Sequence, residues 1–239
     1  MKLDLQKANK FAQMASIAYK DNAAADYKKL GYTKHTFLDI DGAQCHIVWN
    51  NKEAALCFRG TEPDELSDVL ADLNAWPKKS MTDGWVHSGF RGELDKLWDN
   101  ILVQLEKLKD KKLFICGHSL GAAMATICTS RVEEFTEVAG LYTYGSPRAG
   151  TRSFVKGIKT EHWRFVNNND IVTAVPLALM GYKHHGNLVY INHYGKIRKL
   201  TFWQKVKDKF RGWRSGALDG VKDHNMGYYI SYTEKDNND

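Results

Sequence analysis

The segment Leu113-Phe114-Ile115-Cys116-Gly117-His118-Ser119-Leu120-Gly121 decides the fold of this chain. Its four apolar residues are typical of a buried strand, and the stretch that follows, from Ala122 to Phe135, is typical of a helix. Between them lies a G-x-S-x-G pattern, in which a β-carbon at either glycine would clash across a sharp strand-to-helix turn. We therefore expect a strained turn that exposes the Ser119 hydroxyl at the carboxyl end of a strand. A chance glycine–serine turn is the alternative.

On both sides of this segment the chain alternates between strand-like and helix-like stretches. Short apolar runs predict further strands at Thr36–Ile40, Cys45–Trp49, Ala54–Phe58, Val138–Tyr144, His162–Val166, Asn187–Tyr194 and Ile197–Leu200. Apolar residues at helical spacing predict helices at Leu5–Tyr19, Phe90–Leu108 and Asp223–Tyr232. Because helices separate successive strands, we expect an α/β fold with a mostly parallel central sheet flanked by helices, in a single domain over residues 1–239.

The composition is that of an ordinary globular protein. Of its 239 residues 43% are hydrophobic and 26% are charged, which excludes a disordered chain. No apolar run reaches about 18 residues and no apolar signal segment follows Met1, so we expect a cytoplasmic protein or one exported without a recognisable signal, with no transmembrane segment. The cysteines occur singly, without a C-x-x-C pair, and we expect them to be reduced and to bind no metal. They are Cys45, Cys57, Cys116 and Cys128.

A serine becomes a nucleophile when a neighbouring base takes its proton, and in chains with this turn the acid and then the histidine follow the serine. Asp170 comes directly after a predicted buried strand, which places it at the same sheet edge as Ser119. Asp219 and Asp223 are weaker candidates because neither follows a core strand. His224, at the start of the last predicted helix, is the candidate base.

His224 is selected from nine histidines by elimination. His35 and His46 precede the serine, and His118 lies inside the turn with its side chain directed away from the Ser119 hydroxyl. Three further histidines are weaker candidates: His184 and His185, which adjoin a glycine and are expected to stabilise a loop, and His193, which falls within a predicted strand.

At this point the sequence resembles the class 3 (fungal-type) lipases of the α/β-hydrolase superfamily, in order from about Phe11 to Tyr229. The motifs that carry the resemblance are Phe58-Arg59-Gly60-Thr61, Val86-His87-Ser88-Gly89-Phe90, Gly117-His118-Ser119-Leu120-Gly121-Ala122, Tyr142-Thr143-Tyr144-Gly145-Ser146-Pro147-Arg148, Asn169-Asp170-Ile171-Val172 and Asp223-His224. The resemblance implies an α/β-hydrolase fold with a short helical lid.

The resemblance also assigns roles to residues. It implies that Ser119 is the nucleophile, Asp170 the acid and His224 the base. It further implies an oxyanion hole formed by the backbone N–H groups of Thr61 and Leu120. Thr61 as an ordinary strand-end cap is the alternative.

The segment after Thr61 predicts a short amphipathic helix. Its apolar residues lie at helical spacing, at Leu66, Val69, Leu70 and Leu73. The resemblance implies that this helix, at about residues 62–76, is a lid whose apolar face covers the substrate groove and opens at a lipid surface. A plain surface helix packed on the core is the alternative. Arg59 and Asp72 are candidates for an ion pair that braces the oxyanion loop.

The function predicted from these features is a serine carboxylic-ester hydrolase that cleaves acyl esters of lipids, a triacylglycerol lipase or esterase. It would act through a Ser-His-Asp triad and an acyl-enzyme intermediate, without a metal or organic cofactor. A phospholipase A1-type enzyme and a short-chain esterase are alternatives within the same chemistry. A catalytically silent membrane-binding module is the alternative outside it.

The positive charge of the chain is concentrated in one segment. The formal net charge is +6, and residues 196–214 contain eight basic residues against Asp208 alone. The same segment carries aromatic residues at Phe202, Trp203, Phe210 and Trp213. This pattern predicts contact with an anionic membrane surface, or else a basic surface helix whose aromatic residues pack on the core. No nucleic-acid motif and no obligate protein partner are evident in the sequence.

Overall fold

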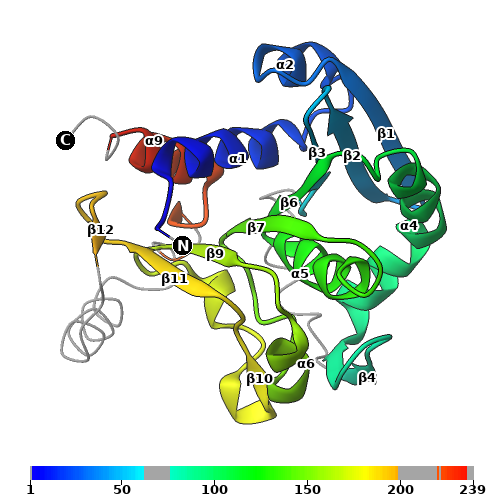
Figure 1. Cartoon of the computed structure of the whole chain (residues 1–239). Coiled ribbons are helices and arrows are strands. Elements are labelled where there is room, and N and C mark those ends of the chain that lie inside the picture. The colour runs from blue at the N-terminus through cyan, green and yellow to red at the C-terminus, as the bar shows by residue number, and fades with distance from the viewer. Residues whose placement is uncertain (1, 62–75, 199–219, 221, 236–239) are drawn as a thin grey trace.

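The computed structural model describes residues 2–61, 76–198, 220 and 222–235. Within them an eight-stranded sheet runs through the centre of the molecule (Figure 1) in the order β1-β2-β3-β6-β7-β9-β11-β12. The strands are β1 (Lys34–Ile40), β2 (Ala43–Trp49), β3 (Glu53–Phe58), β6 (Lys112–His118), β7 (Val138–Tyr144), β9 (His162–Asn167), β11 (Asn187–Ile191) and β12 (Ile197–Arg198).

The middle of this sheet is parallel and its edges are antiparallel. Strands β3, β6, β7, β9 and β11 pair in parallel, whereas the β1–β2 hairpin and β12 add antiparallel edges. The hairpin turns at Asp41 and Gly42, both with positive φ, between two strands that the sequence predicted. The fold class predicted from the sequence, a mostly parallel sheet in an α/β fold, is confirmed.

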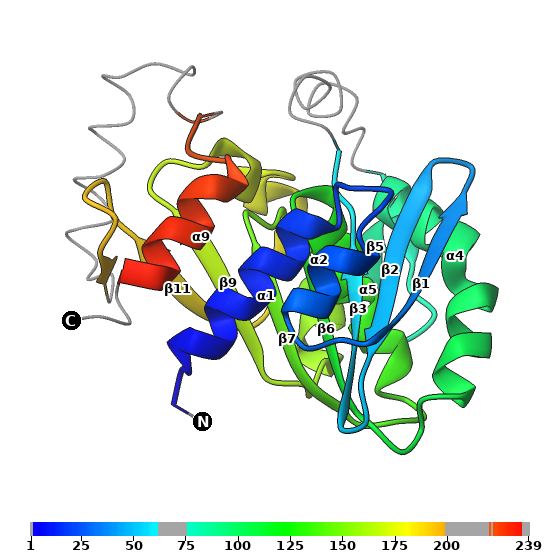
Figure 2. The same cartoon turned by 90° about the horizontal axis from the view of Figure 1, so that it is seen from above.

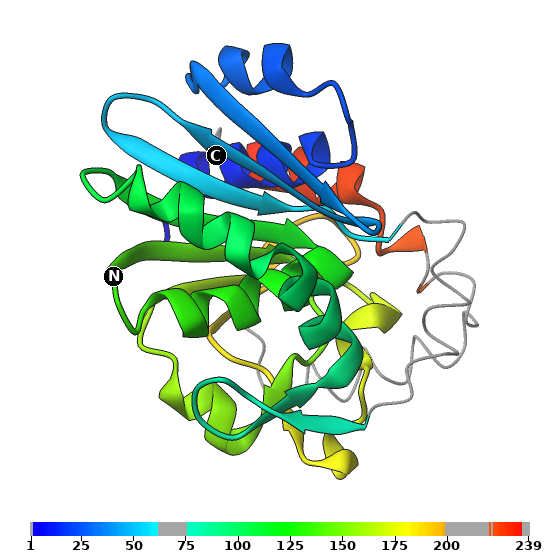
Figure 3. The same cartoon turned by 90° about the vertical axis from the view of Figure 1, so that its right-hand side faces the viewer.

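Helices cover both faces of the sheet and enclose two apolar cores (Figures 2 and 3). On one face lie α1 (Leu5–Ile17), α2 (Ala24–Lys29) and α9 (Met226–Lys235), and on the other lie α4 (Ser88–Glu106), α5 (Leu120–Val132) and the short α6 (Arg152–Gly157). Helix α5 is buried along nearly its whole length, which agrees with its mostly small and apolar residues on all sides.

Helix α9 is held against α1 by polar contacts as well as by apolar packing. The Asn9 amide donates to the carbonyl of Ile230 at 2.9 Å and to the Thr233 hydroxyl at 3.0 Å. This connection brings the end of the chain back to the centre of the sheet, where the motifs identified in the sequence lie. Among the described residues, no helix is both long enough and apolar enough to cross a membrane.

A second, four-stranded sheet was not predicted from the sequence. Its order is β10 (Tyr182–Lys183), β8 (Gly150–Thr151), β5 (Trp85–His87) and β4 (Pro77–Lys79). Strands of two or three residues are too short to show an alternating apolar pattern, so sequence periodicity could not reveal them. Two 3₁₀ turns, η1 (Ile171–Ala174) and η2 (Ala178–Met180), connect the end of β9 to this sheet.

Two local predictions are wrong. His193 lies in an exposed turn because β11 ends at Ile191. His224 lies in the turn before α9 rather than inside a helix, because α9 begins only at Met226. The backbone carbonyls of Asp223 and His224 accept hydrogen bonds from the side chains of Asn167 and His118, so they are not available to a helix at that point.

Candidate active site

The G-x-S-x-G segment forms the strand-to-helix turn predicted from the sequence. Ser119 connects β6 to α5 and adopts φ 56° and ψ −130°, a conformation that is costly for a residue with a β-carbon. A β-carbon built at Gly117 would lie 2.4 Å from the Gly121 carbonyl oxygen, and one at Gly121 would lie 2.4 Å from the Phe58 carbonyl oxygen. Both glycines are therefore required by close backbone contact.

Ser119 lies at the carboxyl end of β6 but is buried. Only 1% of the residue is exposed, so the expectation of an exposed hydroxyl is wrong for this structure. The end of β3 packs closely over the turn, since a β-carbon at Gly60 would lie 3.1 Å from the Ser119 β-carbon. Burial places the serine in a low-dielectric environment, in which hydrogen bonds and charges act more strongly than in water.

The two predicted oxyanion donors lie at one cavity. Leu120 is the first residue of α5, so its N–H has no acceptor within the helix. Thr61 follows Gly60 at the end of the β3 segment, and Thr61 and Leu120 both line a cavity of about 460 Å³. The other residues that line it are Asp21, Gly42, Ala43, Gln44, Arg59, Gly60, Glu93 and Met124. The structure therefore brings these two residues together at one cavity, and Leu120 directly follows Ser119 in the chain.

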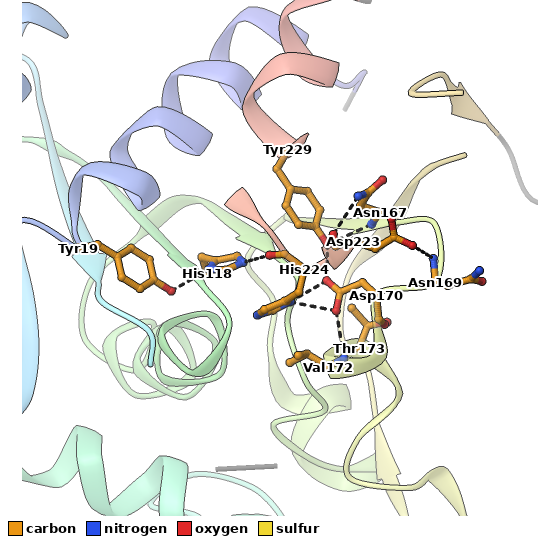
Figure 4. Close-up of polar contacts among 10 residues, drawn as sticks. All are labelled: Tyr19, His118, Asn167, Asn169, Asp170, Val172, Thr173, Asp223, His224 and Tyr229. Atoms are coloured by element: carbon orange, nitrogen blue, oxygen red, sulfur yellow. Dashed lines mark hydrogen bonds and ion pairs between the residues drawn. The ribbon is translucent and has the colours of Figure 1, made fainter. Parts of the chain in front are cut away.

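Asp170 and His224 meet at the carboxyl edge of the sheet, although 53 residues separate them in the sequence (Figure 4). His224 Nδ1 lies 3.0 Å and 2.9 Å from the two carboxylate oxygens of Asp170, and both residues are buried. A carboxylate next to Nδ1 favours the imidazole tautomer with its proton on Nδ1. In that tautomer Nε2 is the nitrogen that can accept a proton. Gly145, with φ 58°, lies against this pair: a β-carbon there would be 2.7 Å from the imidazole ring.

His224 Nε2 is buried and has no hydrogen-bond partner among the described residues. The hydrogen bond to the Ser119 hydroxyl is therefore not formed in this structure. Catalytic hydrogen bonds are often long without substrate and tighten when it binds. A buried imidazole nitrogen without a hydrogen bond lowers the stability of the folded protein. Its presence here therefore indicates that Nε2 interacts with another group during function.

Tyr229 is the residue of this site that sequence reasoning missed. Its hydroxyl donates to Asp170 Oδ2 at 2.5 Å and accepts the Asn167 N–H at 3.1 Å (Figure 4). Asp170 Oδ1 accepts a further hydrogen bond from the Val172 N–H at 3.0 Å. Burial, together with the nearby Asp170 carboxylate, raises the pKa of Tyr229 well above its usual value, so the hydroxyl stays protonated and donates.

Asp223 does not contact the His224 ring in the way that Asp170 does. Its carboxylate accepts from the Asn168 amide at 2.9 Å and from the Asn169 N–H at 3.1 Å, which holds the loop that carries Asp170. The other alternative acid, Asp219, lies outside the described residues.

His118 stacks on the His224 ring with centroids 4.4 Å apart, but both of its nitrogens are engaged. Its Nε2 donates to the His224 carbonyl at 2.8 Å, and its Nδ1 lies 2.8 Å from the Tyr19 hydroxyl (Figure 4). Burial lowers the pKa of His118 well below its usual value, so the ring is neutral. His118 therefore supports the backbone at His224 and has no nitrogen left for the Ser119 proton.

The other histidines weighed in the sequence have partners away from Ser119. His35 Nε2 lies 2.8 Å from His46 Nδ1, and His184 Nε2 donates to the Thr173 carbonyl at 2.9 Å. His185 Nδ1 lies 3.1 Å from Nδ1 of His162. These contacts connect strands and loops and do not reach the strand-to-helix turn.

Several predicted features lie outside the described residues. They are the lid residues Leu66, Val69, Leu70 and Leu73, the brace candidate Asp72, and the aromatic residues Phe202, Trp203, Phe210 and Trp213. Arg59 is described, and its guanidinium donates to Gln44 at 2.6 Å and to Asp21 at 2.9 Å. All four cysteines are buried and unpaired. Within the described part of the chain, no group of three or more His, Cys, Asp or Glu side chains could hold a metal ion.

Comparison with known proteins gives a consistent result. The profile of the family "Lipase (class 3)" matches residues 55–180, which confirms the resemblance seen in the motifs. The toxin TseL of Vibrio cholerae is 40% identical over 197 residues, a match that covers 64% of this chain and 31% of TseL. The secreted mono- and diacylglycerol lipase A of Penicillium cyclopium is 32% identical over 143 residues, covering 56% of this chain and 46% of that protein.

Among solved structures, the triacylglyceride lipase of Rhizomucor miehei superposes with a TM-score of 0.69 at 22% sequence identity. The superposition covers 80% of this chain and 81% of that one, and it supports the α/β-hydrolase fold. The chain spans about a third to a half of the length of the curated relatives named above.

Proposed function

Because the chain belongs to the class 3 lipase family, we propose that it is a serine carboxylic-ester hydrolase that cleaves acyl esters of lipids. The observation that carries the proposal is the contact between His224 Nδ1 and the Asp170 carboxylate, at 2.9 and 3.0 Å, at the sheet edge where Ser119 holds its strained conformation. A base oriented by a carboxylate next to a serine in such a turn is the arrangement that acyl transfer requires.

In the proposed mechanism, the Ser119 hydroxyl attacks the ester carbonyl while His224 Nε2 takes its proton. The Asp170 carboxylate holds the imidazole and stabilises its positive charge. His224 then protonates the leaving alcohol, and the acyl group remains on Ser119. Water, activated by the same imidazole, releases the acid and restores the serine. Nothing in this sequence of steps needs a metal or an organic cofactor.

Negative charge on the carbonyl oxygen would be stabilised by backbone donors. The N–H groups of Leu120 and Thr61 are the proposed donors, supported by the position of both residues in the lining of one cavity and by the place of Leu120 directly after Ser119. Leu120 also starts α5, whose N-terminal end favours an anion. Removing one donor of this kind typically slows acyl transfer by about 10²–10³-fold.

We propose acylglycerols as the substrate class, a choice that follows the name of the Penicillium cyclopium relative. We further propose that residues 62–76 act as a lid over the substrate groove, and that the basic segment with Phe202, Trp203, Phe210 and Trp213 contacts an anionic membrane surface. We also propose that the whole chain, residues 1–239, forms one domain.

The nucleophile assignment is tested by replacing Ser119 with alanine. Ser119→Ala is expected to lower kcat for a soluble p-nitrophenyl ester by about 10⁴-fold or more, because no other group can form the acyl-enzyme. Ser231→Ala is the matched control, since it removes a hydroxyl from α9 whose contact is with the Tyr228 carbonyl.

A fluorophosphonate probe gives a second readout that does not depend on substrate choice. It should label the unmodified protein and the Ser231→Ala variant but not Ser119→Ala. Full hydrolysis by a folded Ser119→Ala variant would overturn the assignment. Absence of both labelling and hydrolysis in the unmodified protein would instead favour the silent membrane-binding module.

A further inference from the structure

An exposed apolar turn extends from the second sheet. The sequence Leu177-Ala178-Leu179-Met180-Gly181 is exposed at every position and has no polar side chain. Leu179 is 97% exposed, Leu177 55% and Met180 52%. Single exposed apolar residues are common on protein surfaces, but three large ones within four positions form a continuous patch that calls for a partner.

The turn is held in place by hydrogen bonds at its base. The Arg148 guanidinium donates to the carbonyl of Pro176 at 2.7 Å and to that of Ala174, and the Arg148 N–H donates to the Val175 carbonyl at 2.8 Å. Within the turn, the Met180 N–H donates to the Leu177 carbonyl at 3.0 Å. The apolar side chains are therefore presented on an ordered support.

Basic residues lie along the small sheet: Lys183 and Arg152 belong to or follow the strands next to the turn, whereas Lys78 and Lys79 lie on β4 at the opposite edge. Thr151 of β8 pairs with Tyr182 of β10, and the Trp85 N–H donates to the Thr151 hydroxyl, so β4, β5, β8 and β10 lie side by side. The exposed cations of these strands and of the first residue after β8 are Lys78, Lys79, Arg152 and Lys183. None of the four forms an ion pair with a described residue.

Further apolar surface lies on the same small sheet. Trp85 is 49% exposed and Met81, in the turn between β4 and β5, is 57% exposed. Trp76, immediately before β4, is 75% exposed. Aromatic and apolar side chains with lysines between them suit the interface of a lipid bilayer, where the rings sit among the headgroups.

The position of the turn relates it to the candidate active site. The chain runs from Asp170 through η1 directly to Leu177, so the turn belongs to the same loop that carries the candidate acid. Figure 1 shows this yellow segment next to β10 at the periphery of the described part of the molecule.

We propose that the turn Leu177–Gly181 inserts into the surface of an anionic lipid bilayer, with Lys78, Lys79, Arg152 and Lys183 contacting the lipid phosphates. This docking surface differs from the lid and from the basic segment at residues 196–214. It deepens the proposed function, on which it rests, because it would hold the loop of Asp170 at the lipid surface. Charge complementarity selects the occupant, since a neutral apolar partner would leave on this sheet four cations that have no ion-pair partner among the described residues.

Vesicle binding tests the proposal in the Ser119→Ala background, in which lipid is not consumed. This protein should sediment with vesicles of equimolar phosphatidylglycerol and phosphatidylcholine. Adding Leu177→Ser, Leu179→Ser and Met180→Ser together should weaken that binding by about tenfold or more. Val103→Ser is the matched control, because Val103 is also 57% exposed but lies on α4. Thermal midpoints of the variants establish that each is folded.

The charge arm uses Lys78→Ala, Lys79→Ala and Lys183→Ala together. For this variant, the ratio of the affinity for anionic vesicles to the affinity for pure phosphatidylcholine vesicles should fall by about tenfold. Added salt should also weaken its binding less than it weakens binding of the background protein. Equal binding of the triple serine variant and its background would overturn the docking turn. Equal binding of the unmodified surface to neutral and anionic vesicles would overturn the role of the cations.

Self-association of the protein through this patch, without vesicle binding, would assign the surface to a second copy and would also overturn the proposal. Sedimentation with vesicles does not depend on ester hydrolysis. The vesicle assay can therefore contradict the docking surface while the hydrolysis assay supports Ser119 as the nucleophile, and the reverse outcome is equally distinguishable.

Discussion

Tyr229 shows how one hydroxyl orders the candidate acid. Its O–H donates to Asp170 while its oxygen accepts the Asn167 N–H, so a single atom connects the acid to the end of β9. Together with the Val172 N–H, this contact fixes the carboxylate that faces His224. We regard Tyr229 as a positioning residue, since it reaches the imidazole only through Asp170.

Replacing Tyr229 with phenylalanine should therefore lower kcat and leave KM nearly unchanged. The expected loss in kcat is about tenfold, because the carboxylate loses one of its charge-assisted hydrogen bonds. The free energy of unfolding should fall by about 1–3 kcal/mol, since the buried Asn167 N–H loses its acceptor.

Tyr228→Phe is the control for this substitution. Tyr228 is the neighbouring residue on α9, is 43% exposed and stacks on Tyr232 rather than on the site. If both variants reduced kcat equally, the effect would belong to the helix and not to the hydroxyl at Asp170.

The connection between β6 and α5 depends on close backbone contact. The Cα of Gly121 faces the carbonyls of Phe58 and Arg59, and a β-carbon there would lie 2.4 Å and 2.7 Å from their oxygens. Because backbone atoms on a central strand cannot move aside easily, a methyl group at this position must displace either β3 or α5.

Gly121→Ala should destabilise the protein by about 1–3 kcal/mol and reduce ester hydrolysis, since the displaced elements carry Leu120 and Ser119. Gly92→Ala is the opposite case on another helix. A β-carbon at Gly92 of α4 would meet nothing within 4 Å, so alanine should stabilise that helix by up to about 1 kcal/mol. Urea unfolding measures both, and equal effects of the two substitutions would contradict the argument.

The whole molecule contains several histidines that are buried in the neutral form. Burial lowers the pKa of His46 to about 4 and that of His87 to about 4, and both have an Nε2 atom without a hydrogen-bond partner among the described residues. Burial together with the charge of Arg164 lowers the pKa of His184 to about 3. In the unfolded chain each would titrate near 6.5.

Stability should therefore decrease as the pH falls. Between pH 6.5 and about 4 the unfolded chain binds protons that the folded protein excludes, so the free energy of unfolding declines over this range. The slope is at most about 1.4 kcal/mol per pH unit for each such histidine. Urea unfolding at pH 7 and pH 5 measures it.

His46→Gln should make this pH dependence shallower, since one buried group no longer titrates. An unfolding free energy that does not change between pH 7 and pH 5 would contradict the interpretation.

The sequence by itself determined the strands of the central sheet, the long helices and the strand-to-helix turn. Apolar periodicity and the two glycines around Ser119 act over a few residues, and local patterns of that kind are written in the sequence. The ordered motifs also identified the family, and the position of Asp170 directly after a predicted core strand ranked it above Asp223. Their order along the chain could be read without knowing where they lie in space.

Only the tertiary structure decided which side chains meet. Asp170 and His224 come together because the end of β9 and the turn before α9 lie at the same edge of the sheet. No local pattern in the sequence encodes this contact. Tyr229, the neutral state of His118 and the small second sheet have the same origin: each depends on burial and on contacts between segments far apart in the sequence. The exposed turn at Leu179 was likewise hidden, because an apolar run in a sequence predicts burial until the fold shows that nothing in the described chain covers it.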